Sequence, residues 1–492
     1  MNKLLKNLLP GYEVPAEVEV NGITRDSRKV EPGNLFVAVP GIDGDGRNYI
    51  DEAIKKKAAA ILYEKDWEKI PENSSVPLIG IKDLSSKIGE VASRFYDHPS
   101  MDLRIMAVTG TNGKTSCSYF IATALNALGV KCGVVGTLGS GFPEALRNPG
   151  LTTPETIELQ KILADLKGRG ASAVALEASS HGLDQGRLDG INIDIAVLTN
   201  ISRDHLDYHQ DFEHYKRSKS RLFLRTGLSG MVLNIDDELG RELLSKMQTA
   251  TGVLTYSTVN ASADIYAENC VFSENGIEFD LKIPSGRLTV HSPLIGKFNL
   301  ANLLALAGVL YLLRFDLEQM RIALSTIRGV KGRMEVLKKD GFPTVVVDYA
   351  HTPDALEKAL DAMRGHCKGK LVCVFGCGGD RDKGKRPMMG DIAVKRSDEV
   401  WITNDNPRRE SYGKIIEDIL SGVSRRESVY IESDRTLAIG KAIAGACSDD
   451  WILVAGKGHE AWQEMDGERL PYSDHEVVAK IFSAGNTKVG KR

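Results

Sequence analysis

Charge of one sign is not in excess in this chain. Its 63 basic and 66 acidic residues are interspersed and leave a formal net charge of -3 over 492 residues. Proteins that bind nucleic acids or anionic membranes through their general surface carry a basic excess, so the composition argues against both classes. An anionic ligand must therefore be bound by a local group of residues.

Long apolar runs are also missing. The first fifteen residues contain no uninterrupted apolar stretch followed by a small-residue cleavage site, so they do not resemble a signal peptide. The most apolar stretch, residues 300–315, is interrupted by Asn302 and Arg314 and falls short of the roughly 18 residues that a membrane span needs. We expect a core helix there and a cytoplasmic protein.

Paired cysteines at metal-ligand spacing are absent as well. The seven cysteines are scattered and odd in number, and they include no CxxC motif or histidine at ligand spacing. A reduced, cytosolic setting fits this usage better than a disulfide framework. Cys373 and Cys377 lie in the strand-like run KLVCVFGC, where we expect buried core residues, with metal ligation as the alternative.

The chain instead alternates strand-like and helical segments. Its length suggests about three domains. The first part ends in a polar, proline-containing stretch at 96–100, and the central part opens with a strand, a glycine turn and an amphipathic helix at 115–128. A fresh strand and helix alternation follows. We predict an α/β protein with mostly parallel sheets and domains at 1–100, 101–335 and 336–492.

A glycine-rich loop, TGTNGKT at 109–115, follows the first strand of the central part. Its glycines let successive backbone N–H groups face an anion, and the next helix adds its positive end. Lys114 is expected to reach the β- and γ-phosphates of a nucleotide, and Thr115 to offer its hydroxyl to Mg²⁺. Val108 replaces the first glycine of the usual pattern, and an ordinary glycine turn is the alternative. The expected nucleotide contacts are Gly110, Thr111, Asn112, Gly113, Lys114 and Thr115.

Two potential metal ligands follow the next strands of this sheet. Glu177 ends the strand-like SAVALEAS, and His205 comes just after IDIAVLTN. Ligands collect at the carboxyl ends of parallel strands, and with Thr115 these residues form a set suited to Mg²⁺ rather than to a closed zinc site. Taken alone, each could equally be a solvated loop residue. Lys219 lies in a basic stretch that composition alone assigns to a solvated helix face.

Seven motifs, in order along the whole chain, resemble those of the Mur ligases. The resemblance implies an N-terminal domain that binds a UDP sugar, a central P-loop ATPase domain, and a C-terminal Rossmann-like domain that brings an amino acid. The motifs are TGTNGKT (109–115), EASSHG (177–182), NISRDHLD (200–207), YKRSK (215–219), GKFNLAN (296–302), GRME (332–335) and DYAHTPD (348–354).

The resemblance also implies two metal ions. Thr115 and Glu177 would hold one Mg²⁺, while His205 and Lys219 would hold the second. Lys219 would be N6-carboxylated, because a carbamate converts a cationic side chain into an anionic oxygen ligand. Lys114, Glu177, His205 and Lys219 are accordingly the expected catalytic residues.

Further ATP contacts are implied toward the C-terminal part. Asn299 and Asn302 resemble the family's adenine-side residues, although Asn302 could simply be a polar interruption of a buried helix. Arg333 and Asp348 resemble ATP contacts, and His351 a position near the phosphates.

The terminal parts suggest the other substrates. The start of the chain resembles the uridine-binding region of the tripeptide synthetase branch, and the central part resembles its muramoyl-dipeptide site. The expected contacts to this substrate are Ser27, Arg28, Thr152, Thr153, Ser179, Gln185 and Arg187.

Specificity for the amino acid is suggested by DNPR at 405–408. It resembles the signature of members that use meso-diaminopimelate rather than lysine. Diaminopimelate carries a distal carboxylate that the planar guanidinium of Arg408 can pair with bidentately. Lysine would leave that arginine unpaired, and such sites reject the analogue by roughly 10⁴ to 10⁵. Without the resemblance, a turn with a surface arginine is the simpler interpretation. The expected pocket is Arg381, Asp405, Asn406, Pro407, Arg408, Gly456 and Glu460.

The resemblance to the Mur ligases implies an ATP-dependent amide ligase of peptidoglycan synthesis. It would add meso-2,6-diaminopimelate to UDP-N-acetylmuramoyl-L-alanyl-D-glutamate through an acyl phosphate, with ATP as substrate and Mg²⁺ as cofactor. We expect a monomer whose partners are small molecules only. The alternatives are a lysine-adding homologue, a more distant folate-polyglutamate ligase, and a nucleotide-dependent switch or assembly ATPase without ligase chemistry.

Overall fold

The computed structural model describes residues 2–41, 44–67, 70–71, 74–147, 150–247 and 252–484. It divides into two compact units, each described by itself below. The first is Met1–Tyr256 with Gly308–Phe315, and the second is Ser257–Ala307 with Asp316–Arg492. The domain boundaries predicted at residues 100 and 335 stay a prediction.

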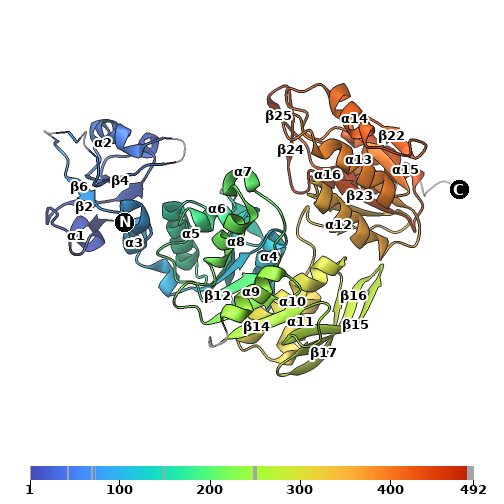
Figure 1. Ribbon diagram of the computed structural model, residues 1–492, viewed down its shortest axis with the longest axis horizontal. Helices are drawn as coiled ribbons and strands as arrows, with labels where there is room; N and C mark the ends of the chain where they lie inside the picture. The colour runs from blue at the N-terminus through green and yellow to red at the C-terminus, as the bar shows by residue number, and fades with distance from the viewer. Residues whose placement is uncertain are drawn as a thin grey trace. The chain divides into compact units, whose positions relative to one another are not determined.

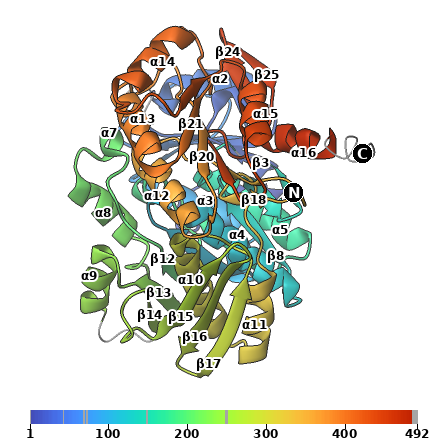
Figure 2. The ribbon, with the colours of Figure 1, turned by 90° about the vertical axis from the view of Figure 1, so that its right-hand side faces the viewer.

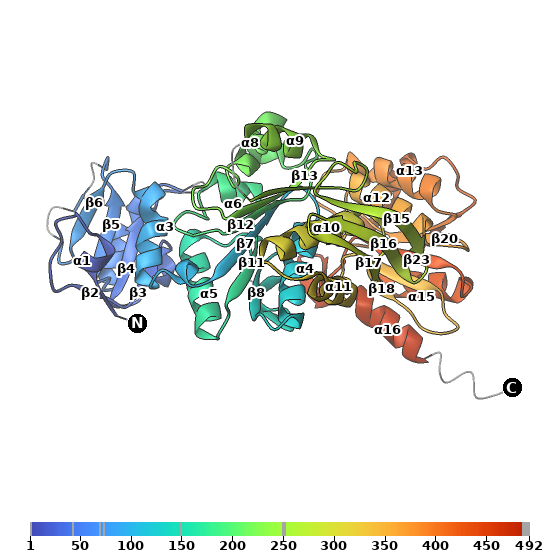
Figure 3. The ribbon, with the colours of Figure 1, turned by 90° about the horizontal axis from the view of Figure 1, so that it is seen from below.

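The first unit begins with a small, entirely parallel sheet in the order β3-β4-β5-β6. All five residues of β4, NLFVA, are buried, as expected for a parallel strand covered on both faces. Helix α3 buries Leu84, Ile88 and Val91 on one face, and Figure 3 shows it beside this sheet. The elements are β1 (Lys3–Leu4), α1 (Leu5–Leu8), β2 (Glu19–Val20), β3 (Gly22–Thr24), β4 (Asn34–Ala38), α2 (Ile50–Lys55), β5 (Ala60–Glu64), β6 (Leu78–Ile81) and α3 (Leu84–Phe95).

The larger sheet of the first unit has the strand order β10-β9-β8-β11-β7-β12-β13-β14. Figure 1 labels its strands β12 and β14, and Figure 3 labels β8, β11, β7, β12 and β13. Its strands from β8 to β14 in that order are parallel, whereas β9 and β10 form an antiparallel edge. The strands are β7 (Arg104–Thr109), β8 (Cys132–Gly136), β9 (Gly139–Phe142), β10 (Ala145–Arg147), β11 (Ala173–Glu177), β12 (Ile195–Leu198), β13 (Gly230–Asn234) and β14 (Val253–Ser257).

Strand β7 lies where the order of this sheet reverses, because β8 and β11 lie to one side of it and β12 to β14 to the other. Loops at the carboxyl ends of strands diverge at such a point and leave room for a ligand. The glycine-rich loop follows β7 directly. The helices are α4 (Lys114–Ala127), α5 (Thr156–Gly168), α6 (Ser180–Asp184), α7 (Leu206–His209), α8 (Phe212–Ser220) and α9 (Glu238–Lys246).

The second unit opens with an antiparallel meander that the strand and helix alternation of the sequence did not predict (Figure 2). Its strands alternate buried and exposed residues, as expected for a sheet with one solvated face. Two helices follow, of which the first, α10, has its last residues, 308–312, in the first unit. Their buried leucines confirm the core helix expected near residues 300–315. The elements are β15 (Ile265–Ser273), β16 (Gly276–Ile283), β17 (Gly286–Ser292), α10 (Lys297–Leu312) and α11 (Leu317–Thr326).

The remaining residues form a second doubly wound sheet in the order β18-β19-β23-β20-β21-β22, parallel except for β18. Cys373 and Cys377 are 0% and 3% exposed, which confirms them as core residues. The elements are β18 (Glu335–Leu337), β19 (Thr344–Asp348), α12 (Pro353–Arg364), β20 (Leu371–Phe375), α13 (Lys385–Arg396), β21 (Glu399–Ile402), α14 (Tyr412–Ser421), β22 (Val429–Ile431), α15 (Arg435–Gly445), β23 (Trp451–Ala455), β24 (Trp462–Met465), β25 (Glu468–Pro471) and α16 (Asp474–Ala484).

Mostly parallel α/β sheets are therefore present as predicted. Among the helices that the structure describes, none combines the length and apolar character that crossing a bilayer requires.

Candidate active site

The glycine-rich loop joins β7 to α4 through two glycines in the left-handed region. Gly110 has φ of 151° and Gly113 has φ of 85°. A Cβ atom on Gly110 would lie 1.9 Å from Thr199 Oγ1, so a side chain is excluded there. The N–H of Thr111 donates to the carbonyl of Asn200 at 2.7 Å. The loop is thereby fixed against the segment that follows β12.

Two further residues of the loop are held in place by hydrogen bonds. The N–H of Asn112 donates to Asn200 Oδ1 at 3.0 Å. Lys114 begins α4, and its Nζ donates back to the carbonyls of Gly110 at 2.8 Å and Thr111 at 2.9 Å. The ammonium group therefore lies over the loop, where the phosphates of a nucleotide are expected.

Thr115 and Glu177 are in direct contact. The hydroxyl of Thr115 donates to Glu177 Oε2 at 3.0 Å, and Glu177 is only 1% exposed. Thr137 also donates to this carboxylate, through its N–H at 2.8 Å and its hydroxyl at 3.1 Å. A buried carboxylate beside a hydroxyl provides the hard oxygen donors that Mg²⁺ prefers, so these residues fit that ion.

Lys219 is buried in the same region. It lies on α8, is 1% exposed, and donates from Nζ to the carbonyl of Gly110 at 2.7 Å. Burial, together with the nearby Lys114 cation, lowers the pKa of Lys219 well below its usual range. The solvated helix face that composition suggested for Lys219 is therefore wrong. The burial of Tyr215, Ser218 and Lys219 shows that this face of α8 is directed inward.

His205 lies just before α7 in a left-handed conformation with φ of 52°. Its ring centroid is 4.9 Å from that of His181 and 6.5 Å from that of Tyr215. The Tyr215 hydroxyl lies 2.9 Å from Thr111 Oγ1, so this ring connects α8 to the glycine-rich loop. A shared metal ion between His205 and Lys219 stays a prediction.

Thr152, Thr153 and Ser179 gather around Glu177. The hydroxyl of Thr153 donates to the Glu177 carbonyl at 2.7 Å and accepts the N–H of Ser179 at 2.9 Å. The hydroxyl oxygens of Thr152 and Thr137 are 3.0 Å apart. These residues of the predicted dipeptide site thus adjoin the predicted metal ligand.

Gln185 and Arg187 extend the same group. Arg187 Nη1 donates to the Thr153 carbonyl at 2.8 Å, and its Nε donates to Gln185 Oε1 at 3.0 Å. The Gln185 amide donates in turn to the Tyr208 hydroxyl at 3.1 Å. Five of the seven residues predicted to bind the muramoyl dipeptide are therefore brought together.

The other two, Ser27 and Arg28, lie beside the N-terminal sheet. Ser27 is buried and donates to Glu52 Oε2 at 3.0 Å. Arg28 is exposed and pairs with both oxygens of Asp26 at 2.9 Å. In the described part of the chain, neither side chain forms a hydrogen bond or ion pair with the dipeptide group.

Asn299 and Asn302 are 3% and 5% exposed in the second unit. The Asn302 amide donates to Asn299 Oδ1 at 3.2 Å, and the Asn299 amide donates to the Ile295 carbonyl at 2.9 Å. Their amide groups therefore support each other. Contact with adenine stays a prediction.

Tyr349 connects the remaining predicted ATP residues. The Arg333 guanidinium lies 4.6 Å from the centre of the Tyr349 ring. The centre of the His351 ring also lies 4.6 Å from the centre of the Tyr349 ring. Asp348 Oδ2 accepts the N–H of Met334 at 2.7 Å, which fixes the turn that carries Arg333. Tyr349 was not among the predicted site residues, although it lies within the motif DYAHTPD.

Asn406 joins the predicted amino-acid pocket into one network. Its amide donates to Glu460 Oε2 at 3.0 Å, and its Oδ1 accepts Lys457 Nζ at 3.0 Å. Lys457 is 0% exposed and also donates to Glu460 at 3.0 Å. Lys457 was missed, and its position at the carboxyl end of β23 is the signal that could have found it.

Arg408 is partly buried rather than a surface residue, with 18% of its side chain exposed. It has φ of 53°, which a non-glycine residue adopts only rarely. Its Nη1 donates to the Gly379 carbonyl at 2.8 Å, and its Nε lies 3.5 Å from Glu464 Oε2. The backbone therefore directs the guanidinium toward the loop at Gly379.

The other predicted pocket residues lie around this loop. A Cβ atom on Gly456 would lie 2.4 Å from Asp405 Oδ2, and one on Gly379 would lie 1.9 Å from the Pro407 carbonyl. Two glycines thus allow two backbone segments to approach the 405–408 turn. Arg381 follows the Gly379 loop and is exposed.

A buried arginine supports the pocket from behind. Arg386 is 0% exposed, and it donates to both oxygens of Glu410 at 2.7 and 2.8 Å and to Asp418 at 2.8 Å. It also donates to the Gly378 carbonyl at 3.1 Å. This network fixes the loop on which Arg408 rests.

We expect Arg386→Ala to reduce the free energy of unfolding by about 3 kcal/mol, because it leaves carboxylates without their buried partner. The Arg386 guanidinium lowers the pKa of Glu410 from 4.5 to about 2. The stabilisation that the ionised Glu410 gives the folded protein is fully present above the pKa of Glu410 in the unfolded chain. It is lost as the pH falls from about 4.5 toward 2. Urea unfolding at pH 7 and pH 3 tests both points. The exposed pair of Arg321 with Glu318 provides the control, and an equal loss in Arg321→Ala would contradict the prediction.

Three protein-family models match consecutive segments of the chain. Residues 19–96 match the family model "Mur ligase family, catalytic domain", residues 108–310 match "Mur ligase middle domain", and residues 332–458 match "Mur ligase, glutamate ligase domain". The resemblance found in the sequence motifs is thus confirmed by independent models for three consecutive segments.

Two relatives and one solved structure resemble nearly the whole chain, and all three bear the name UDP-N-acetylmuramoyl-L-alanyl-D-glutamate–2,6-diaminopimelate ligase. The protein from Pseudomonas syringae pv. tomato is 48% identical, covering 94% of this chain and 95% of its own. That from Coxiella burnetii is 46% identical, covering 98% and 99%. The solved structure is 36% identical, has a TM-score of 0.77, and covers 99% of this chain and 100% of its own.

Proposed function

The chain belongs to the Mur ligase family and is an ATP-dependent acid–amino-acid ligase, and we propose that it joins meso-2,6-diaminopimelate to UDP-N-acetylmuramoyl-L-alanyl-D-glutamate in peptidoglycan synthesis. The observation that carries this proposal is the 46–48% identity to ligases of that name over nearly the whole chain. Such a match includes both the nucleotide loop and the amino-acid pocket, rather than the shared ATP machinery alone.

Thr115 and Glu177 are the proposed ligands of one Mg²⁺, and His205 with carboxylated Lys219 the proposed ligands of a second. The contact of the Thr115 hydroxyl with the buried Glu177 carboxylate supports the first assignment. When bound, Mg²⁺ supplies positive charge against the phosphate oxygens of ATP. Lys114, already directed over the glycine-rich loop, would add a further positive charge.

The chemistry must activate a carboxylate before an amine can attack it. In the proposed reaction, an oxygen of the glutamate γ-carboxylate forms a bond to the γ-phosphorus of ATP, and the bond to the bridging oxygen breaks to release ADP. The neutral diaminopimelate amine then attacks the acyl carbon, phosphate leaves with the electron pair of the acyl–oxygen bond, and the nitrogen releases one proton to solvent water. Lys114 would neutralise charge on the transferred group. Holding three substrates in line can contribute on the order of 7 to 11 kcal/mol.

The muramoyl dipeptide would be bound by Thr152, Thr153, Ser179, Gln185 and Arg187. Thr153 contacts Glu177 directly, and hydrogen bonds through neighbouring residues connect the other four to it. This supports the assignment, because the glutamate carboxylate must reach the phosphate that the metal site would hold. Ser27 and Arg28 would contact the uridine end. The N-terminal domain of this proposal spans residues 1–100, the central domain 101–335 and the C-terminal domain 336–492.

The diaminopimelate side chain would be selected by Arg408, with Arg381, Asn406 and Glu460 contacting its charged groups. The partial burial of Arg408 supports this role, since among the described residues its guanidinium has only a 3.5 Å pair with Glu464 through Nε and can bind a second carboxylate through its other nitrogens. Because ATP and a nucleotide-linked sugar are its substrates, we infer a cytoplasmic enzyme. That it acts as a monomer stays a prediction.

Phosphate release by the purified enzyme tests the proposal. With Mg-ATP and the nucleotide-linked dipeptide, we expect release to require meso-diaminopimelate and to form one new amide per phosphate. Release with lysine at a comparable rate would favour a lysine-adding ligase. ATP hydrolysis that is equally fast without dipeptide and amino acid would indicate a switch or assembly ATPase, and the proposal would be abandoned.

A further inference from the structure

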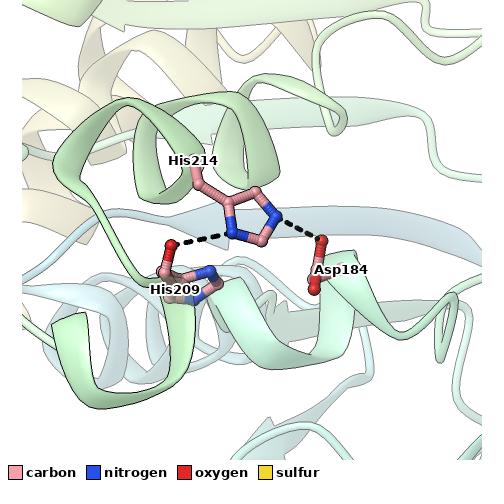
Figure 4. A group of neighbouring side chains, drawn as sticks. All are labelled: Asp184, His209 and His214. Atoms are coloured by element: carbon pink, nitrogen blue, oxygen red, sulfur yellow. Dashed lines mark hydrogen bonds and ion pairs between the residues drawn. The ribbon is translucent and has the colours of Figure 1, made fainter.

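Three side chains converge between α6, α7 and α8 without taking part in the proposed reaction. Asp184 ends α6, His209 ends α7, and His214 lies on α8 (Figure 4). One potential ligand atom of each lies within 4.8 Å of those of the other two. Among the residues that the structure describes, this is the group of histidine, cysteine and acidic side chains with such spacing.

The buried ring of His209 gives the first indication that this group binds a ligand. Its side chain is 0% exposed, yet neither ring nitrogen has a hydrogen-bond partner. Burial lowers the pKa of His209 to about 4, so the ring is neutral near pH 7. A neutral imidazole has one N–H donor and one lone pair, and interiors rarely leave both unsatisfied. A cation accepting that lone pair would satisfy part of this requirement.

His214 provides an independent sign. Its Nδ1 lies 2.9 Å from the carbonyl oxygen of His209, which can only accept, so Nδ1 carries the hydrogen. In the neutral ring the lone pair of Nε2 then faces Asp184 Oδ1 at 3.4 Å. Two lone pairs at that distance repel unless a cation lies between them or the ring is protonated. An Nδ1–H bonded to a backbone carbonyl is also the usual way in which a metal-binding histidine is oriented.

Hydrogen bonds orient the Asp184 carboxylate, as is usual for a carboxylate that binds a metal ion. Its Oδ2 accepts the Tyr208 hydroxyl at 3.1 Å, and its Oδ1 accepts the Ser218 hydroxyl at 3.3 Å. Arg221 Nη1 lies 3.2 Å from Oδ1 and competes with a cation for that oxygen. The Arg221 side chain is 53% exposed, so it can move into solvent when a cation binds.

We propose that Asp184, His209 and His214 bind one divalent cation of the imidazole-preferring class, of which Zn²⁺ is the type. Two imidazole nitrogens and one carboxylate oxygen form such a donor set, with water completing the coordination. Tetrahedral ligands at about 2.1 Å from the ion lie roughly 3.4 Å apart. The His214–Asp184 separation of 3.4 Å already meets this spacing. The donor set is distinct from Thr115 and Glu177, whose oxygens suit Mg²⁺.

The position of this site gives it a consequence for the enzyme. The ion would connect α7 and α8 to α6, and α7 and α8 make up most of the stretch from His205 to Lys219. The inference itself does not depend on the proposed reaction, because binding is measured without substrates.

Titration of the full-length, chelator-stripped protein with Co²⁺ tests the site, with millimolar Mg²⁺ present to fill the oxygen-rich sites. We expect one equivalent to bind and the visible absorption of tetrahedral Co²⁺ to appear. In His214→Ala, whose ring is partly exposed, affinity should fall by at least about 100-fold. His291→Ala, which removes an exposed histidine on β17, and His205→Ala should both retain it.

X-ray absorption of Co²⁺ in the unaltered protein provides a second measurement that does not depend on any variant folding. Two imidazole ligands are expected. Absence of binding in the unaltered protein would mean that a buried water satisfies His209, and the inference would be wrong. Binding that survives in His214→Ala, or that disappears in His205→Ala, would place the ion elsewhere and would equally overturn it.

Discussion

Lys219→Ala should reduce ligase turnover by at least about 10³-fold, which corresponds to roughly 4 kcal/mol of transition-state stabilisation. Lys219 is 1% exposed and donates to the Gly110 carbonyl of the glycine-rich loop, so alanine removes a group that contacts the predicted nucleotide site. If the side chain is carboxylated, alanine also removes the ligand of the second metal ion. Phosphate release and product formation under saturating substrates measure the effect.

Lys216→Ala provides the matched control on the same helix. Lys216 is 6% exposed, but it pairs with Glu242 at 2.6 Å instead of approaching the loop. Its variant should keep a turnover number near that of the unaltered enzyme. Substantial turnover in Lys219→Ala would remove Lys219 from the site, whereas equal losses in both variants would point to damage to α8.

Carboxylation of Lys219 has a signature of its own. The amine nitrogen bonds to the carbon of CO₂ and releases one proton to water, and only the neutral amine can react. Burial lowers the pKa of Lys219, which makes that form accessible below the usual lysine range. Removing CO₂ should therefore lower activity, and bicarbonate should restore it faster as the pH rises. Ligase activity that is the same with and without CO₂ would exclude the carbamate.

Replacement of Arg408 should abolish the preference for diaminopimelate. We expect the unaltered enzyme to favour diaminopimelate over lysine by roughly 10⁴ in kcat/KM, and Arg408→Met to reduce that ratio to within about tenfold. The reason is that lysine has no distal carboxylate to balance the charge of the partly buried guanidinium beyond its 3.5 Å pair with Glu464, whereas methionine requires no anionic partner. Steady-state kinetics with each amino acid in turn measures the ratio.

Arg409→Ala is the neighbouring control, because Arg409 is exposed and follows Arg408 directly. Its amino-acid preference should be unchanged. A preference that persists in Arg408→Met would mean that the distal carboxylate is recognised elsewhere, with exposed Arg381 as the first candidate.

Much of the fold could be predicted because the responsible features are local. Strand β4 is buried along its whole length, and the glycines at 110 and 113 are needed wherever a backbone adopts positive φ between a strand and a helix. The antiparallel meander β15–β17 was missed, since its alternating pattern is weaker than that of buried parallel strands. The predicted roles of Asn299, Arg333 and the 405–408 motif rest on family resemblance rather than on any pattern of their own.

The sequence by itself thus determined the parallel sheets, the glycine-rich loop after β7 and the family. Only the tertiary structure decided that Lys219 is buried at Gly110, that Lys457 supports Asn406, and that Asp184 meets two histidines. The physical reason is that hydrophobic periodicity reports which face of an element is buried. It does not report which distant residues meet there, because those contacts arise only when helices pack on the sheet.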